Sequence, residues 1–230
     1  PEQRRLLRRA PTIGQADVYA CERNGQRLLI KDFSGRPVFA RLSVVRFLVR
    51  HECAIMARLR DLRGIPRFHG MSGKDVFVME YIHKAEVLRS ERRMPPQDYP
   101  SLDFFRMLRH IVHRIHQRGV VHGDLRRRNI LRTPEGPVVI DFATGLCREG
   151  WGRPVRERVF DYLRRVDNRK ALKLQAAYYP DSLGPDERAV LAECPQLLHL
   201  GEMLRKKLIK PYFTRKRWIE RFDRWRTQMK

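Results

Sequence analysis

Cysteine is scarce in this chain of 230 residues, and its few thiols are scattered. The four cysteines stand at positions 21, 53, 147 and 194, without a Cys-x-x-Cys spacing. This pattern argues against a disulfide scaffold or a cysteine-based zinc site and favours reduced thiols. Long apolar runs are also missing, and the N-terminus lacks the apolar core of a secretory signal. We therefore expect a cytoplasmic protein that forms one unit with a sizeable core.

Acidic residues are few relative to basic ones. There are 49 Lys and Arg against 26 Asp and Glu, which gives a net charge of +23. A nucleotide ligand does not require such an excess, so the composition predicts a polyanionic partner. The charge is heavy at arginines 4, 5, 8 and 9 and in residues 205–230, where aromatic and aliphatic residues are interleaved with basic ones. That tail is equally typical of an interfacial membrane helix and of a solvated face that packs on the protein, while nucleic acid ranks third as partner.

The most informative segment is residues 120–146, VVHGDLRRRNILRTPEGPVVIDFATGL. The turn signal at 133–137 separates Ile130-Leu131 from the β-branched run 138–140, which predicts a hairpin. Such a hairpin returns Asn129 and Asp141 to one end, so that a carboxylate and an amide oxygen face the same point. Mg²⁺ prefers hard oxygen ligands and retains waters, so this pair predicts a metal site completed by phosphate oxygens.

Asp124 precedes this hairpin on a loop. From there its carboxylate can accept the proton of an attacking hydroxyl and orient that hydroxyl for in-line transfer. For any single one of these residues, the simpler interpretation is an Asp or Asn that caps local backbone. The ordered set of Asp124, Asn129 and Asp141 favours the catalytic interpretation.

The pattern HxDLxxxxN, followed by a hairpin that ends in Asp-Phe, resembles the catalytic loop and metal-binding motif of the protein-kinase-like superfamily. The sequence HGDL, with Gly123 where arginine is usual, is most similar to the bacterial lipopolysaccharide-core kinase and RIO-like group, while Ala143 is a departure from the usual Asp-Phe-Gly. The resemblance implies an α+β, two-lobed protein-kinase-like fold, with an antiparallel-sheet N-lobe over residues 1–82 and a reduced helical C-lobe over 83–230. It also implies that Arg126 takes the place of a lysine that neutralises the transferred phosphoryl group.

The same resemblance implies a nucleotide site in the N-terminal part. Strands at 17–21 and 27–32, joined by Asn24-Gly25, carry Lys31 as the lysine that pairs with the α- and β-phosphates. A helix over 41–60 carries Glu52 as the partner of Lys31. For both residues the alternative is an ordinary solvated charge.

Two further parts of the nucleotide site follow from the resemblance. Gly14 marks the phosphate-covering loop, although that loop has one glycine where the family has three. The strand at 76–82 corresponds to the hinge, where the backbone of Glu80 and Ile82 would bind the adenine edge. An ordinary buried strand satisfies the same apolar pattern.

The elements around the catalytic loop are expected to be helical. A helix over 101–118 precedes the loop, and His116 and His122 are expected to buttress it. Separate helices are predicted at 155–166, 168–177, 185–192 and 197–207. Asp161 would brace the loop from the first of these, or simply pair with Arg164 or Arg165 on the surface.

These residues together predict a phosphotransferase that uses ATP and Mg²⁺. We expect its acceptor to be a hydroxyl of a lipopolysaccharide core sugar, with the protein attached peripherally to the inner membrane face. One alternative is a RIO-like serine/threonine kinase or ATPase. The other is a pseudokinase scaffold that binds a polyanion, and this is suggested by the sparse glycine loop and by Ala143.

Overall fold

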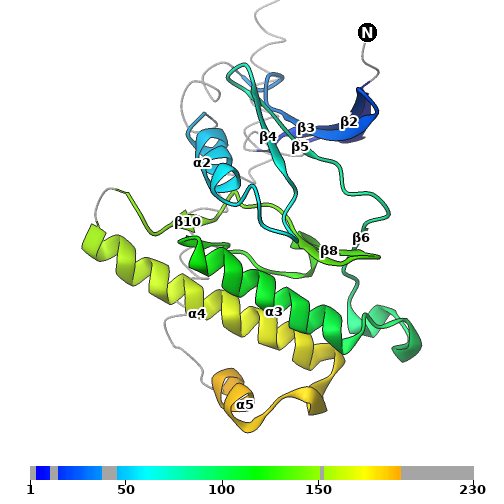
Figure 1. Ribbon diagram of the computed structural model, residues 1–230, viewed down its shortest axis with the longest axis vertical. Coiled ribbons are helices and arrows are strands. Elements are labelled where there is room, and N and C mark those ends of the chain that lie inside the picture. The colour runs from blue at the N-terminus through cyan, green and yellow to red at the C-terminus, as the bar shows by residue number, and fades with distance from the viewer. Residues whose placement is uncertain (1–3, 11–14, 38–45, 151–152, 193–230) are drawn as a thin grey trace, which may run out of the picture.

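A five-stranded antiparallel sheet forms the N-terminal part of the molecule (Figure 1). A computed structural model describes residues 4–10, 15–37, 46–150 and 153–192. The strand order is β1-β2-β3-β5-β4. The strands are β1 (Arg5–Arg8), β2 (Asp17–Arg23), β3 (Gln26–Asp32), β4 (Phe68–Ser72) and β5 (Val76–Glu80). Helix α2 (Arg46–Arg58) packs beside β4.

The β2–β3 hairpin forms where the sequence predicted it. Asn24 and Gly25 have positive φ angles of 51° and 72°, as the two-residue turns that match the strand twist require. Strand β3 then pairs with β5 on its other side, so Lys31 lies opposite Val18 on one neighbour and Phe77 on the other. This central position holds the backbone of Lys31 from both sides.

Helix α3 (Leu102–Gln117) agrees with the predicted helix to within one residue at each end. Ser101 begins it, because its hydroxyl accepts a hydrogen bond from the Phe104 amide at 3.3 Å. Gly119 ends it with a φ of 66°, a backbone conformation that glycine adopts without steric cost. The apolar face of the helix, from Phe104 to Ile115, is buried.

Two small sheets surround the loop that follows α3. One has the order β6-β8-β9 and the other pairs β10 with β7. Their strands are β6 (Glu86–Val87), β7 (Val120–Val121), β8 (Ile130–Thr133), β9 (Gly136–Val139) and β10 (Leu146–Cys147). Short 3-10 helices complete this part: η2 (Glu91–Arg93), η3 (Pro96–Asp98), η4 (Arg127–Asn129) and η5 (Pro180–Ser182).

The two helices predicted at 155–166 and 168–177 are one helix, α4 (Arg153–Tyr178), so that prediction was wrong. Its 26 residues run alongside α3 (Figure 1). The predicted break fell at Asp167. Asp167 is instead fully buried within the helix. Helix α5 (Pro185–Ala192) agrees with its prediction, whereas the helix at 197–207 and the basic tail lie outside the described residues.

One hydrophobic core joins the upper sheet to the helical part. It includes Met56 and Phe77 from above and Leu108 and Phe142 from below. The predicted α+β class, with an antiparallel-sheet N-lobe and few helices in the C-lobe, is confirmed. The division at residue 82 stays a prediction. None of the helices in the described part of the chain combines the length and apolar character needed to cross a bilayer.

Candidate active site

Lys31 and Glu52 form an ion pair between β3 and α2. Nζ of Lys31 lies 2.5 Å from Oε1 of Glu52, and the two side chains are exposed by only 16% and 5%. Helix α2 brings Glu52 to the sheet because its apolar residues on either side, such as Val49 and Met56, are buried in the core. The pair that the resemblance implied is therefore present, and neither residue is an ordinary solvated charge.

Charges around Lys31 determine its protonation. Burial by itself lowers the pKa of Lys31, but the carboxylates of Glu52 and Asp141 raise it, and the net direction is upward from 10.5. Of the two carboxylates, Glu52 has the larger effect on the pKa of Lys31, and Asp141 adds to it. Burial also raises the pKa of the neighbouring Cys53 thiol to about 12, so this thiol stays neutral beside the ion pair.

Asn129 and Asp141 lie at one end of the β8–β9 hairpin. The Ile140 amide donates to the Asn129 carbonyl at 2.9 Å, which holds Asp141 beside Asn129. The buried side-chain amide of Asn129 donates to the Asp124 carbonyl, also at 2.9 Å. Because the amide nitrogen is used in this bond, the amide oxygen is the atom that can ligate a cation.

The donor set of Asn129 and Asp141 fits Mg²⁺. Asp141 is exposed and has a φ of 69°, in the left-handed region that Asp and Asn adopt more readily than most residues. One carboxylate and one amide oxygen leave positions for phosphate oxygens and water. No group of three or more His, Cys, Asp or Glu side chains able to hold a metal occurs among the residues with described positions. A magnesium ion held by Asn129 and Asp141 would take its remaining ligands from phosphate oxygens and water.

Asp124 lies on a loop that His122 supports. Nδ1 of His122 accepts a hydrogen bond from the Asp124 amide at 3.2 Å, so Nε2 carries the proton and donates to the Ile140 carbonyl at 3.0 Å. The predicted support of the loop by His122 is therefore confirmed. The Asp124 carboxylate contacts the guanidinium of Arg126. The structure thus brings together the groups predicted to orient the hydroxyl and to neutralise the phosphoryl group, and these two roles stay predictions.

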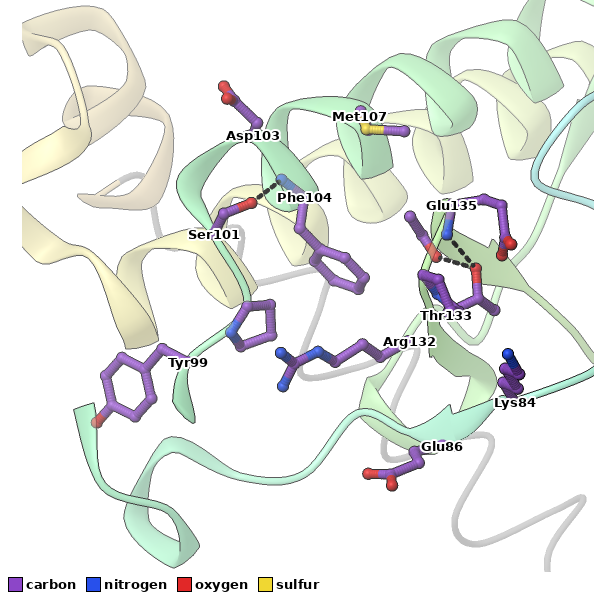
Figure 2. Close-up of a pocket in the computed structure, with 13 residues that line it drawn as sticks. Lys84, Glu86, Tyr99, Ser101, Asp103, Phe104, Met107, Arg132, Thr133 and Glu135 are labelled. Atoms are coloured by element: carbon purple, nitrogen blue, oxygen red, sulfur yellow. Dashed lines mark hydrogen bonds between the residues drawn. The ribbon is translucent and has the colours of Figure 1, made fainter. Parts of the chain in front are cut away.

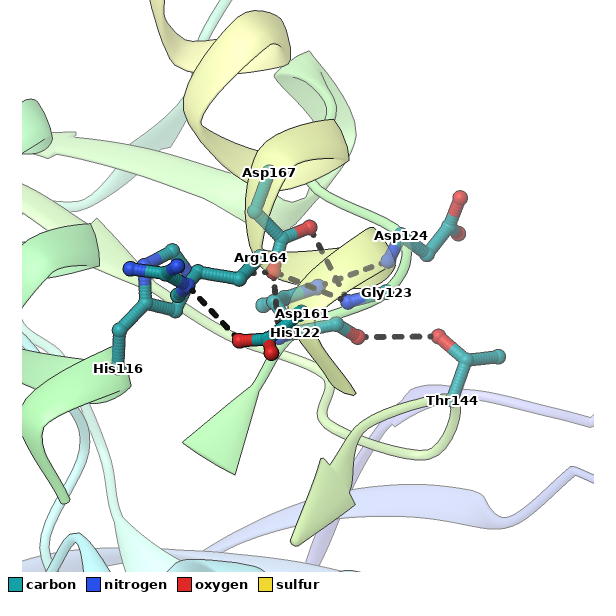
Figure 3. Close-up of polar contacts among 8 residues, drawn as sticks. All are labelled: His116, His122, Gly123, Asp124, Thr144, Asp161, Arg164 and Asp167. Carbon is teal, nitrogen blue, oxygen red and sulfur yellow. Dashed lines mark hydrogen bonds and ion pairs between the residues drawn. The ribbon is translucent and has the colours of Figure 1, made fainter. Parts of the chain in front are cut away.

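Asp167 is the residue of the site that the sequence analysis missed. Its carboxylate accepts hydrogen bonds from the His122 amide at 2.7 Å and from the Gly123 amide at 3.2 Å (Figure 3). Nε2 of His116 lies 3.5 Å from the same carboxylate, as expected for a histidine that buttresses the loop. A buried carboxylate at the middle of α4 therefore fixes the start of the catalytic loop.

Asp161, which was considered for that task, does not perform it. It is 44% exposed and pairs with Arg164 at 3.5 Å and with Arg148 at 3.8 Å, so the surface alternative is correct. The sequence does carry a signal for Asp167. It falls on the buried face of one continuous helix, in helical register with Phe160, Ala171 and Leu174. Because the sequence analysis divided this helix in two at position 167, the register was not recognised.

The structure explains why glycine, and not the arginine common in the protein-kinase-like superfamily, follows His122 in this loop. Its φ is 74°, and a Cβ atom there would lie 2.5 Å from the Thr144 carbonyl oxygen. The Thr144 hydroxyl in turn donates to the His122 carbonyl at 3.3 Å. The catalytic loop and the segment after Asp141 are therefore packed too closely for any side chain at position 123.

Helix α2 is also attached to the segment after Asp141. Nε2 of His51 lies 2.8 Å from the Gly145 carbonyl, and Arg58 lies 2.6 Å from Glu149. His51 precedes Glu52 in the chain. Its contact therefore ties the position of the Lys31 partner to the segment that follows Asp141.

The remaining predicted positions are less defined. Gly14 lies outside the described residues. The strand predicted to reach residue 82 ends at Glu80, where the Glu80 amide donates to the Arg67 carbonyl at 2.8 Å. Because the Glu80 amide is already bonded, the atoms left to bind the adenine edge are the Glu80 carbonyl and the backbone of Ile82. The hinge stays a prediction.

A cavity of about 780 Å³ lies away from these residues, between the start of α3 and the β8–β9 turn. Phe104 and Arg132 point into it, and Glu86 and Glu135 stand at its edges (Figure 2). None of the predicted site residues lines this cavity. It is therefore separate from the candidate active site.

Comparisons with known proteins identify several similar chains. NUAK family SNF1-like kinase 1 of Mus musculus is 33% identical over 113 residues, which cover 47% of this chain and 17% of that protein. Its Homo sapiens counterpart is 35% identical over 88 residues, covering 36% of this chain and 13% of that protein. The chain thus spans less than a fifth of the length of these relatives.

Among solved structures, the Rio2 kinase of Chaetomium thermophilum in a complex with ADP, Mg²⁺ and phosphoaspartate matches with a TM-score of 0.49 and 18% identity. The match covers 76% of this chain and 57% of that chain. The model of the RIO domain family matches residues 23–147, more than half of the chain and the part that contains Lys31, Glu52, Asp124, Asn129 and Asp141. The protein therefore belongs to the RIO domain family.

Proposed function

We propose that this protein is an ATP- and Mg²⁺-dependent phosphotransferase that moves the γ-phosphoryl group to a hydroxyl. The observation that carries the proposal is the set of contacts around Lys31. This ammonium is paired with the buried Glu52 and is acted on by Asp141, which stands beside Asn129 at the hairpin end. A fixed cation next to a carboxylate and an amide oxygen suits a magnesium-bound nucleotide triphosphate.

Asp124 is the proposed hydroxyl-orienting residue. Its backbone is bound by His122 and by the Asn129 side chain, so its carboxylate is held at a fixed distance from the metal ligands. Arg126 contacts that carboxylate and would neutralise charge on the transferred phosphoryl group. Mg²⁺, when bound, would shield the phosphates and orient them.

For the acceptor, we propose a serine or threonine side chain of a protein, as in the RIO-like alternative. The family match at residues 23–147 favours this alternative. The lipopolysaccharide core sugar and the inner-membrane location were inferred from the basic, aromatic tail, which lies outside the described residues. A cytoplasmic location remains part of the proposal, supported by the thiols of Cys53 and Cys147, which are not in disulfides.

The test is ATP turnover by the purified chain with protein acceptors. Asp124→Ala is expected to retain Mg·ATP binding and to lose about 10²- to 10⁴-fold in turnover. Asp141→Asn is expected to lose magnesium-dependent nucleotide binding, because Asn tolerates the same backbone angle but lacks the charge. No turnover by the wild-type chain would instead support a scaffold, and equal turnover by Asp124→Ala and wild type would overturn the role of Asp124.

A further inference from the structure

Four exposed arginines lie in η4, which follows Asp124 in the chain, and in and just before η2, which contacts η4. Arg128 follows Asp124 by four residues and immediately precedes Asn129 in η4. Arg92 and Arg93 belong to η2, and Arg89 comes just before that turn. We call these four residues the arginine face.

One contact joins η2 to η4, and a second joins the residue before η2 to α4. Nη1 of Arg127 lies 2.6 Å from Oε2 of Glu91, and Glu91 is 19% exposed in this pair. The Tyr178 hydroxyl of α4 donates to the Arg89 carbonyl. The backbone that carries the arginine face is therefore attached to the same framework as Asp124.

The acidic residues nearby do not neutralise this face. Glu91 is held by Arg127 and lies 3.7 Å from Arg92, while Glu86 lies 3.6 Å from Arg89 in a pair whose side chains are both more than 60% exposed. Arg93 and Arg128 have no ion pair within the described ranges. Exposed pairs of this kind contribute little, so the face presents a positive surface to an approaching acceptor.

The arrangement of the charges indicates the shape of the ligand. The arginines come from η2, from η4 and from the residue Arg89 before η2, and all four are exposed. Arg89 and Arg93 also line a cavity of about 380 Å³, but Glu86 and Asp98 line it as well, so this cavity does not suit a phosphorylated sugar. Guanidinium groups spaced along a surface suit carboxylates spaced along an extended chain. We propose that the arginine face selects a serine or threonine within an acidic protein segment. This inference rests on the proposed function, and it names the acceptor class of the same site.

The experiment compares two peptides that contain one serine. One carries aspartate at the three positions on each side of the serine, and the other carries lysine at those positions. Phosphorylation of each is measured as kcat/KM at constant Mg·ATP for the wild-type chain. The acidic peptide is expected to be preferred by at least about tenfold, and the preference is expected to fall as salt is raised.

Charge reversal on the protein tests the assignment to these residues. Arg128→Glu, and separately the double change Arg92→Glu with Arg93→Glu, are expected to lower kcat/KM for the acidic peptide by about fivefold per charge reversed. The same changes are expected to raise kcat/KM for the lysine peptide. Arg114→Glu, an exposed change of equal charge on α3, is the matched control and should leave the preference unchanged.

The outcomes separate this inference from the proposed function. If both peptides are phosphorylated at equal rates, the arginine face does not select acidic segments, although the protein is still a phosphotransferase. The same conclusion follows if Arg114→Glu changes the peptide preference as much as Arg128→Glu does. Transfer to a phosphorylated sugar but to neither peptide also overturns it. If no acceptor is phosphorylated and ATP is not turned over, the proposed function fails first. The KM for ATP should be the same in all these variants, because none of the changed residues belongs to the nucleotide site.

Discussion

At the scale of single residues, the site depends on buried charges that are each matched by a partner. Asp167 offers one carboxylate to two backbone amides, and Glu52 offers one to Lys31. A buried charge without such partners is costly. Each of these acids therefore contributes to both stability and geometry, and each can be tested by an isosteric amide.

Asp167→Asn is expected to lower the free energy of unfolding by about 1–3 kcal/mol, because the neutral side chain binds the two loop amides less strongly. Turnover of ATP should fall as well, since the catalytic loop loses its anchor. Thermal unfolding and a turnover assay measure the two effects. Asp161→Asn is the control, and its effect should stay within about 0.5 kcal/mol because that residue is half-exposed.

Glu52→Gln is expected to destabilise the protein by about 3–5 kcal/mol, because it leaves the ammonium of Lys31 buried without its partner. The pKa of Lys31 is raised on folding, so protonated Lys31 stabilises the folded state below its ordinary pKa of 10.5. That contribution is lost only as the pH rises through the higher folded pKa.

The stability difference between wild type and Glu52→Gln should therefore be constant from neutral pH to about pH 10 and shrink above it. Denaturant unfolding at a series of pH values measures it. A difference that disappears already between pH 7 and 9 would show that the ion pair is not the cause.

At the scale of elements, α2 and the segment after Asp141 act as one piece. His51 on α2 bonds to the Gly145 carbonyl, next to the residue that supports Lys31. The segment between Asp141 and α4 is short in this chain. The hydrogen bond between His51 and this short segment therefore helps to hold Glu52 in its position beside Lys31.

His51→Ala is expected to raise the KM for ATP by about five- to tenfold, the equivalent of one lost hydrogen bond. Its effect on kcat should be smaller, because Asp124 and the hairpin are not touched. Steady-state kinetics with varied ATP separate the two constants. His113→Ala, at an exposed position of α3, serves as control, and an equal rise in KM there would contradict the assignment.

At the scale of the whole molecule, the net charge of +23 opposes the compact state through self-repulsion. Raising NaCl from about 50 to 500 mM shortens the screening length to a few ångströms. The melting temperature is therefore expected to rise over this range and then level off. Differential scanning calorimetry measures it, and a melting temperature that falls with salt would indicate that attractive surface pairs dominate.

The β2–β3 hairpin, α3 and the β8–β9 hairpin could be predicted because their signals are local. Asn24-Gly25 needs only its own backbone preference, Ser101 and Gly119 mark the ends of α3, and a turn separates two apolar runs at 133–137. The pairing of Lys31 with Glu52 was proposed by resemblance, and the structure contains it. The continuity of α4 was missed because a local pattern cannot reveal whether a carboxylate has a distant partner.

The sequence by itself determined the order of elements, the positive charge and the set Asp124, Asn129 and Asp141, since each depends on residue type and spacing along the chain. Only the tertiary structure decided that Asp167, and not Asp161, holds the catalytic loop, and that position 123 must be glycine. These two results depend on distances between segments: 44 residues separate Gly123 from Asp167, and Thr144 approaches Gly123 from the far side of the hairpin. Contacts between distant segments are properties of the assembled molecule, so a helical register can indicate that Asp167 is buried but not which backbone amides it binds.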